Sequence, residues 1–168
     1  MKIRMFSRPL CLLLIAGMVS LISACGFHLR GAQDVPADKQ SVTLQVMSAS
    51  SELLESLRDN LRYNDIEQRT GAPYRIVLLS SRYKRRAVSL SNGSEVDEYE
   101  LSLLVTFHIA DSEGNPLTED IRLQQERVYT YNRNAAAASS EQERLFKQEL
   151  HESVAQSILR RYLASGNQ

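Results

Sequence analysis

The segment from residue 99 to residue 109 constrains the fold of this chain more than any other. Its apolar side chains alternate with polar ones, the pattern of a β-strand with one buried face. The apolar positions are Tyr99, Leu101, Leu103, Val105, Phe107 and Ile109. The positions between them include Glu100, Ser102, Thr106 and His108. The sequence therefore predicts a long strand whose apolar face other elements must cover.

A similar but shorter alternation over residues 42–47 predicts an earlier strand. Leu53, Leu57 and Leu61 follow at helical spacing, after serines that are suitable as N-caps. The period of two then returns at Tyr74 and again over residues 87–90. These patterns predict a strand, an amphipathic helix and a second strand, in that order.

Asn92-Gly93 separates this second strand from the strand at 99–109. A type I′ turn needs positive φ at both central residues, which these two residues tolerate best, so the sequence predicts a β-hairpin here. Residues 117–131 alternate more weakly and carry more polar side chains, which predicts a further strand.

The last part of the chain changes to a helical period. Apolar residues recur every four positions at Phe146, Leu150, Val154, Ile158 and Tyr162. Two overlapping capping boxes precede them, formed by Ser139 with Gln142 and by Ser140 with Glu143. A long C-terminal helix that begins near these serines is predicted.

Together these elements predict an α+β fold with a four-stranded, mostly antiparallel sheet and two helices packed on one face. The first strand could run parallel to a neighbour, because a helix separates it from the other strands. The folded part is expected to be a single domain over residues 41–168.

The N-terminus resembles a bacterial export signal. Lys2, Arg4 and Arg8 precede an apolar run of 13 residues, from Leu10 to Ile22. A helix of that length reaches roughly 20 Å, which is short of the roughly 30 Å needed to cross a bilayer. Residues 1–24 are therefore predicted to be a cleaved signal peptide.

Two interpretations of the cleavage site remain open. Ser23-Ala24 would suit ordinary signal peptidase, whereas Ile22-Ser23-Ala24-Cys25 resembles the lipobox, in which Cys25 becomes the acylated N-terminus. Cys11 lies in the segment that is removed, so the mature chain would hold one thiol and no internal disulfide. Lipidation of Cys25 with a diacylglycerol and an N-acyl chain removes that thiol and anchors the protein.

The residue after the cysteine indicates an address. Gly26 stands where an aspartate would retain a lipoprotein in the inner membrane, so the outer membrane is predicted, on the periplasmic side. Residues 25–40 are polar and contain Gly31 and Pro36, which suits a lipidated tether.

Composition excludes some partners. Removing 24 of 168 residues leaves 144, with 17 basic and 20 acidic residues and a net charge of −3. A slightly acidic domain is not expected to bind nucleic acid.

No constellation in the sequence suggests an enzyme. His28, His108 and His151 lie on three different segments without ligands at metal-binding spacing. Only seven glycines are present, and they are scattered, so no phosphate-binding loop is formed. We predict no catalytic residue, no metal and no cofactor other than the covalent lipid.

One concentration of charge stands out at Arg82, Lys84, Arg85 and Arg86, within a segment predicted as strand. In an extended chain Arg82, Lys84 and Arg86 project from one face, and Tyr83 and Arg85 project from the other. One interpretation is a solvated edge that discourages aggregation between strands. The other is a site for an anion, in particular a phosphorylated lipid.

The segment YTYNRNAAAASS, residues 129–140, also has two interpretations. It is either the end of a strand with a loop and the start of a helix, or an interface anchored by Tyr129, Tyr131 and Arg133.

The motif Cys-Gly-Phe-His-Leu-Arg-Gly at residues 25–31 resembles the start of the mature chain in the LptE family of LPS-assembly lipoproteins. The order of strand, helix, Asn-Gly hairpin and closing helix is similar as well. The resemblance implies a plug within the lumen of the outer-membrane β-barrel LptD, which supports barrel assembly and contacts lipopolysaccharide. Ser91 stands where better-known members carry a basic residue, so the row at 82–86 is the candidate contact here.

Two other functions remain as alternatives: a generic outer-membrane lipoprotein that binds another envelope partner, and a lipid-anchored periplasmic hydrolase. No residue could be nominated for the hydrolase.

Overall fold

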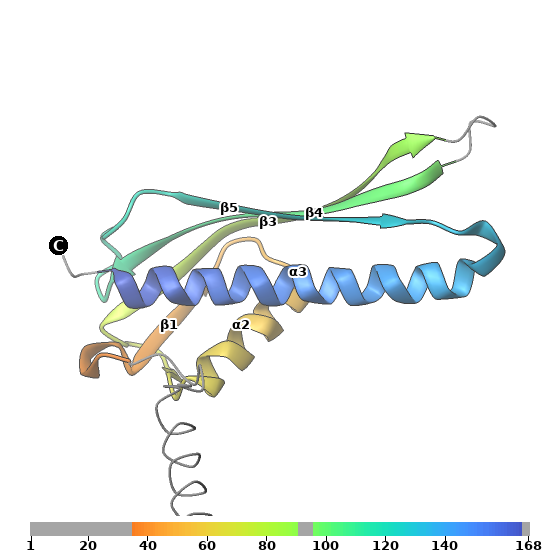
Figure 1. Cartoon of the computed structure of the whole chain (residues 1–168). Helices are drawn as coiled ribbons and strands as arrows, with labels where there is room; N and C mark the ends of the chain where they lie inside the picture. The colour runs from red at the N-terminus through yellow and green to blue at the C-terminus, as the bar shows by residue number, and fades with distance from the viewer. Residues whose placement is uncertain (1–34, 91–95, 166–168) are drawn as a thin grey trace, which may run out of the picture. The chain divides into compact units, whose positions relative to one another are not determined.

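A computed structural model describes residues 35–90 and 96–165 of the chain. The domain combines one mixed sheet with two α-helices and two short 3₁₀ turns (Figure 1). Its elements are η1 (Ala37–Lys39), β1 (Ser41–Val46), α2 (Ser51–Tyr63), β2 (Glu67–Gln68), β3 (Tyr74–Leu90), β4 (Val96–Asp111), β5 (Ile121–Thr130), η2 (Arg133–Ala135) and α3 (Ala136–Ala164).

The sheet has five strands in the order β2-β1-β3-β4-β5. Strand β1 runs parallel to both β2 and β3, whereas β3, β4 and β5 pair antiparallel. The α+β class is confirmed. The prediction of a four-stranded, mostly antiparallel sheet is wrong, because the observed sheet has five strands and is mixed. The missed strand β2 has only two residues, both exposed, so it carries no apolar alternation to detect.

Both helices cover one face of the sheet, as predicted (Figure 1). On β4 the inner residues Leu101, Leu103, Val105, Phe107 and Ile109 are completely buried. Helix α2 contributes Leu53, Leu57 and Leu61, and α3 contributes Leu150, Val154, Ile158 and Tyr162. The two helical apolar stripes therefore pack on the apolar face of the strand that the sequence predicted most clearly.

The predicted starts of the two helices had different outcomes. Ser50 caps α2, since its Oγ accepts a hydrogen bond from Leu53 N at 3.3 Å. Helix α3 instead begins at Ala136, before the predicted serine caps, and Ala135 makes no side-chain cap. The alanine run favours the helical conformation, so the helix begins three residues before Ser139. The buried Oγ of Ser139 accepts a hydrogen bond from Asn132 N at 3.0 Å.

The tip of the β3–β4 hairpin, including Asn92-Gly93, lies outside the described residues, as does Cys25. The strands on either side of the tip are antiparallel, with Leu90 opposite Val96. Lys39 in η1, two residues before the predicted domain boundary at residue 41, is buried. None of the described helices has both the length and the apolar character needed to cross a membrane.

Candidate functional site

The basic row lies on the half of β3 that extends beyond β1. A register shift between Leu78 and Ser80 changes which residues face the helices. Before it, Ile76 and Leu78 point into the core, and after it Tyr83 and Arg85 lie opposite the inner residues of β4. Arg82, Lys84 and Arg86 consequently lie on the open face, the division between faces that the alternation predicted.

Arg86 is held on the open face by a carboxylate of β4. Its Nε and Nη2 donate to the two carboxylate oxygens of Glu100 at 2.7 and 2.9 Å. This bidentate pair lowers the pKa of Glu100 through the hydrogen bond from Arg86. Arg86 therefore already has an anionic partner.

Arg85 belongs to an internal network on the helix side. Its guanidinium lies 3.5 Å from the centre of the Tyr99 ring, and its Nε lies 3.1 Å from Glu143 Oε2. The same Nε is 3.2 Å from the hydroxyl of Tyr129, which donates to Glu143 Oε2 at 2.5 Å. Burial, together with the bond to Glu143, raises the pKa of Tyr129 to about 12. These contacts join β3 and β5 to α3, so Arg85 has a structural role whatever else it binds.

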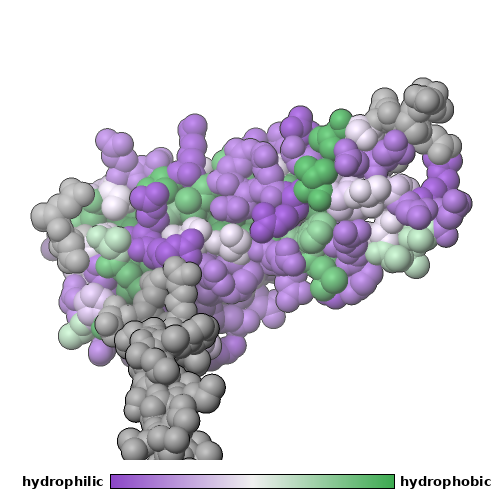
Figure 2. All heavy atoms as spheres, in the orientation of Figure 1, coloured by the Kyte–Doolittle hydropathy of each residue, from purple (hydrophilic) through white to green (hydrophobic). Residues whose placement is uncertain are grey.

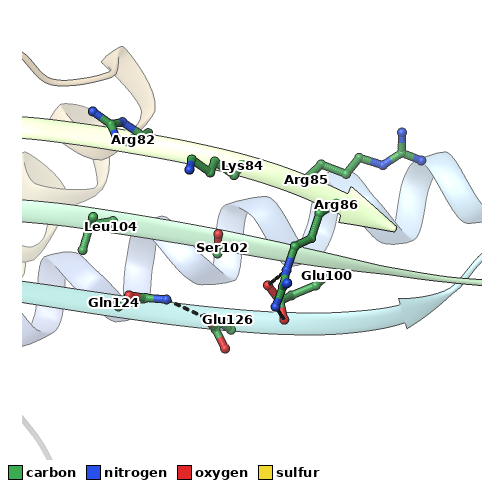
Figure 3. Close-up of a pocket in the computed structure, with 9 residues that line it drawn as sticks. All are labelled: Arg82, Lys84, Arg85, Arg86, Glu100, Ser102, Leu104, Gln124 and Glu126. Atoms are coloured by element: carbon green, nitrogen blue, oxygen red, sulfur yellow. Dashed lines mark hydrogen bonds and ion pairs between the residues drawn. The ribbon is translucent and has the colours of Figure 1, made fainter. Parts of the chain in front are cut away.

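Arg82 and Lys84 differ from the other two cations. Both are exposed, and neither makes a hydrogen bond or an ion pair with the residues that the structure describes. They line a shallow depression of about 450 Å³ on the open face (Figure 3). Its other lining residues are Arg85, Arg86, Glu100, Ser102, Leu104, Gln124 and Glu126.

The depression has charges of both signs on different strands. The cations come from β3, whereas Glu100 on β4 and Glu126 on β5 lie farther across the sheet (Figure 3). Glu100 is neutralised by Arg86, and Glu126 accepts from Gln124 Nε2 at 2.6 Å. An anion would therefore be accommodated near Arg82 and Lys84, with the Ser102 hydroxyl and the apolar Leu104 beside it.

The three candidate interface residues are not brought together as one exposed patch. Tyr129 is only 3% exposed, and its ring stacks on Tyr99 at 5.8 Å. Tyr131 is half-buried and meets the edge of Tyr99 at 5.7 Å, whereas Arg133 is exposed in η2. A partner at this end would meet Tyr131 and Arg133 before Tyr129, and the role of the three residues stays a prediction.

The sequence analysis did not predict several exposed apolar residues near this site. Val128 on β5 is 52% exposed and lies in one row with Glu100 and Arg86 on the open face. Val88 on β3 and Leu145 on α3 are also exposed. The only sign of this exposure in the sequence was the alternation, which places Val128 on the face of the strand opposite to that of Tyr129.

Two histidines can be placed. His151 is buried, and its Nδ1 donates to the Lys147 carbonyl at 2.8 Å, so its Nε2 accepts from Ser50 Oγ at 3.3 Å. His108 Nδ1 lies 3.0 Å from Asp120 Oδ1 on the open face. Within the described ranges no three His, Cys, Asp or Glu side chains are grouped as a metal site would require.

Two solved structures of lipoproteins are similar in fold to this domain. A minor lipoprotein from Acinetobacter baumannii matches with a TM-score of 0.62 at 25% identity, over 75% of this chain and 92% of that one. Rare lipoprotein B from Shewanella oneidensis matches in fold with a TM-score of 0.60 at 24% identity, over 71% of this chain and 91% of that one. The chain therefore shares the fold of these two lipoproteins, and in this chain that fold is an open mixed sheet with two helices on one face.

The family follows from the sequence. The LptE model, described as lipopolysaccharide-assembly, matches residues 40–162, and the chain belongs to this family. LPS-assembly lipoprotein LptE of Pectobacterium atrosepticum is 29% identical over 89% of this chain and 83% of its own length. The LptE of Photorhabdus laumondii is 27% identical over 93% of this chain and 87% of its own length. The predicted family is confirmed, and it is a family of non-enzymatic lipoproteins.

Proposed function

We propose that the mature chain is an outer-membrane lipoprotein that fills the lumen of the LptD β-barrel, supports assembly of that barrel and assists the insertion of lipopolysaccharide into the outer leaflet. The observation that carries this proposal is the family match over residues 40–162, which spans nearly the whole described domain.

The surface of the domain suits a polar enclosure. Only one face of the sheet is covered by helices, and the open face carries charged and amide side chains (Figure 3). In Figure 2 most of the described surface on the visible face is hydrophilic, with hydrophobic residues gathered in a band and in smaller patches. The interior of a large outer-membrane barrel is polar, so such a surface can lie against it without burying unpaired apolar area.

Contact with lipopolysaccharide is proposed for the basic row. Arg82 and Lys84 have no described polar partner, and Leu104 lies beside them in the depression. Arg86 could join them only by sharing its guanidinium with Glu100. Cations next to apolar side chains match a ligand that is both phosphorylated and lipidic. Arg85 is expected to contribute through the network that holds β3 against α3.

The anchor is proposed at Cys25, as a diacylglycerol on the sulfur and an acyl chain on the new N-terminus. Several acyl chains together hold a soluble domain on a membrane far more firmly than one. The segment between Cys25 and residue 35 would keep the domain close to the membrane while the barrel partner folds.

The proposal is tested by affinity purification of the tagged full chain from envelopes solubilised in a mild detergent, under stringent washing. A barrel of the LptD type is expected to co-purify with the tagged chain in a one-to-one molar ratio. Recovery of a different envelope protein in its place would favour a generic binding module. Recovery of no stoichiometric barrel would contradict the plug.

The lipid contact has its own test in the same material. The double variant Arg82→Gln/Lys84→Gln should weaken binding of purified lipopolysaccharide by about tenfold, because two charge-assisted contacts are lost. The double variant Arg58→Gln/Arg62→Gln removes the same charge from exposed positions of α2 and serves as the control. Equal binding by both variants would leave only the role of edge protection for the row.

A further inference from the structure

Strand β3 has a long free edge next to the basic row. Strand β1 pairs with β3 only from Tyr74 to Leu78, although β3 continues to Leu90. Beyond Leu78, β4 lies on one side of β3, and the described part of the chain places no strand on the other (Figure 3). Every second residue there directs its backbone N–H and C=O away from β4, a ready template for a further strand.

The free edge is regular over a useful length. The register with β4 is continuous from Ser80 to Ala87 and is interrupted on either side, between Leu78 and Ser80 and between Ala87 and Ser89. Ser50 N donates to Ser81 Oγ at 3.4 Å, so the loop before α2 reaches the edge only at its start. The residues from Arg82 to Ala87 therefore form a straight, accessible edge of ordinary strand length.

The charges on this edge select the strand that could bind. Arg82, Lys84 and Arg86 stand on the open face, and the first two have no described anionic partner. A second copy of the same edge would place cations opposite cations, which is unfavourable in neighbouring strands. A strand with carboxylates at every second position would place them beside these cations.

We propose that the β3 edge over residues 82–87 is a docking site for an extended, acidic polypeptide segment, which adds to the sheet as a sixth strand. Backbone hydrogen bonds supply the affinity, and the row of cations supplies the preference for alternating acidic residues. The row then has two complementary effects, since it excludes self-association of the edge and admits a partner of opposite charge. This inference goes beyond the proposed function, because it holds whether or not lipopolysaccharide uses the same cations.

The test uses the full chain in detergent and a fluorescent peptide of about eight residues that alternates Glu with Val. Two further versions of the peptide carry N-methyl groups on every second amide. In one version (one phase) the amides of the Glu residues are methylated, and in the other version (the other phase) those of the Val residues are methylated. A peptide that adds as a strand donates from only one of the two sets of amides. One phase should therefore weaken binding by about tenfold or more, while the other phase leaves it nearly unchanged.

Charge is tested in the same titration. Arg82→Gln/Lys84→Gln should weaken binding of the unmethylated peptide by about tenfold, whereas Arg58→Gln/Arg62→Gln should not. Equal binding of both methylated phases would overturn the proposal, because it would show a polyanion held by charge alone. Unchanged binding by the β3 double variant would overturn the role of the cations. Lipopolysaccharide binding is indifferent to peptide methylation, so failure of this proposal is distinguishable from failure of the proposed function.

Discussion

At the scale of single residues, Lys39 joins the two ends of the described domain. It is 1% exposed, and its Nζ donates to the carbonyl of Leu163 at 2.7 Å and to that of Ser165. The rings of Tyr74 and Tyr162 lie about 6 Å from the ammonium group, at 5.8 and 6.0 Å. A cation at the C-terminus of α3 satisfies carbonyls that have no helical partner and complements the helix dipole.

Replacement of this lysine should therefore destabilise the domain. Lys39→Met keeps the length of the side chain but leaves the carbonyls of Leu163 and Ser165 without their donor, at a cost of about 1–3 kcal/mol. Lys84→Met, at an exposed position, is the matched control and should change stability little. Urea unfolding measures both variants, and equal stabilities would contradict the capping role of Lys39.

His151 should make stability depend on pH. Burial lowers its pKa in the folded state, although the hydrogen bond to the Lys147 carbonyl and the charge of Glu52 partly oppose the shift. The unfolded chain, with an ordinary value of about 6.5, therefore takes up the proton first. Stability is fully present above that pH and should fall as the pH decreases below it.

Urea unfolding midpoints, measured at several pH values between neutral and mildly acidic, give the slope of stability against pH. His151→Gln should flatten the profile, because the buried group no longer titrates. Glu52 does not interfere, since its hydrogen bond from Lys147 lowers its pKa to about 2 and its contribution is lost only as the pH falls below the ordinary value of 4.5. An unchanged slope in His151→Gln would show that another group causes the dependence.

Two tyrosines with buried hydroxyl groups differ in their hydrogen bonding. The hydroxyl of Tyr83 is buried without a hydrogen-bond partner among the described residues. The hydroxyl of Tyr162 instead lies 3.0 Å from each of two acceptors, the carbonyls of Lys39 and Ser41. Tyr83→Phe should be neutral or stabilising, whereas Tyr162→Phe should lose about 1–2 kcal/mol. Thermal or urea unfolding compares them, and a larger loss for Tyr83→Phe would reverse this assignment.

At the scale of elements, the sequence predicted the strands and helices that show a clear apolar periodicity. The alternation over 99–109 identified β4, and the spacing of Leu53, Leu57 and Leu61 identified α2. Strand β2 was not predictable, because it exists only through backbone pairing: Glu67 N donates to Gln40 O at 2.8 Å, and Arg69 N donates to Val42 O at 3.0 Å. A two-residue strand of this kind has no period of its own.

The candidate site shows the same limit. The division of the basic row between two faces follows from alternation, so it could be predicted. The partners of Arg85, Glu143 on α3 and Tyr129 on β5, are distant in sequence and could not. The alternation did not reveal that Arg85 and Arg86 have ion-pair partners, whereas Arg82 and Lys84 have none among the residues that the structure describes. Pairing depends on which strands and helices become neighbours.

The network around Glu143 should control how firmly the distal half of β3 is held against α3. Glu143→Gln removes the charge that Arg85 and the Tyr129 hydroxyl share, and should cost about 1 kcal/mol for this half-exposed pair. Hydrogen exchange should increase in residues 83–87 and in the first turns of α3. Glu141→Gln, which loses only a surface pair with Arg144, is the control. Identical exchange in both variants would show that the network is not needed.

At the scale of the whole molecule, the domain has two unlike faces. The helices and the apolar rows of the sheet form one core, while the open face keeps its charged side chains exposed. No mechanism of catalysis is needed to account for this arrangement in a family of non-enzymatic LPS-assembly lipoproteins. The proposed functions therefore concern what the open face and the free edge of β3 contact, and the lipid anchor expected at Cys25.

Native mass spectrometry of the complex purified from envelopes is the sharpest test of the proposed plug and its lipid anchor. We predict a one-to-one assembly of an LptD barrel with a chain that begins at Cys25 and carries the added mass of a diacylglycerol and an N-acyl chain. A chain that starts elsewhere or lacks acyl groups would contradict the anchor. A chain released from the envelope without a barrel would contradict the account as a whole.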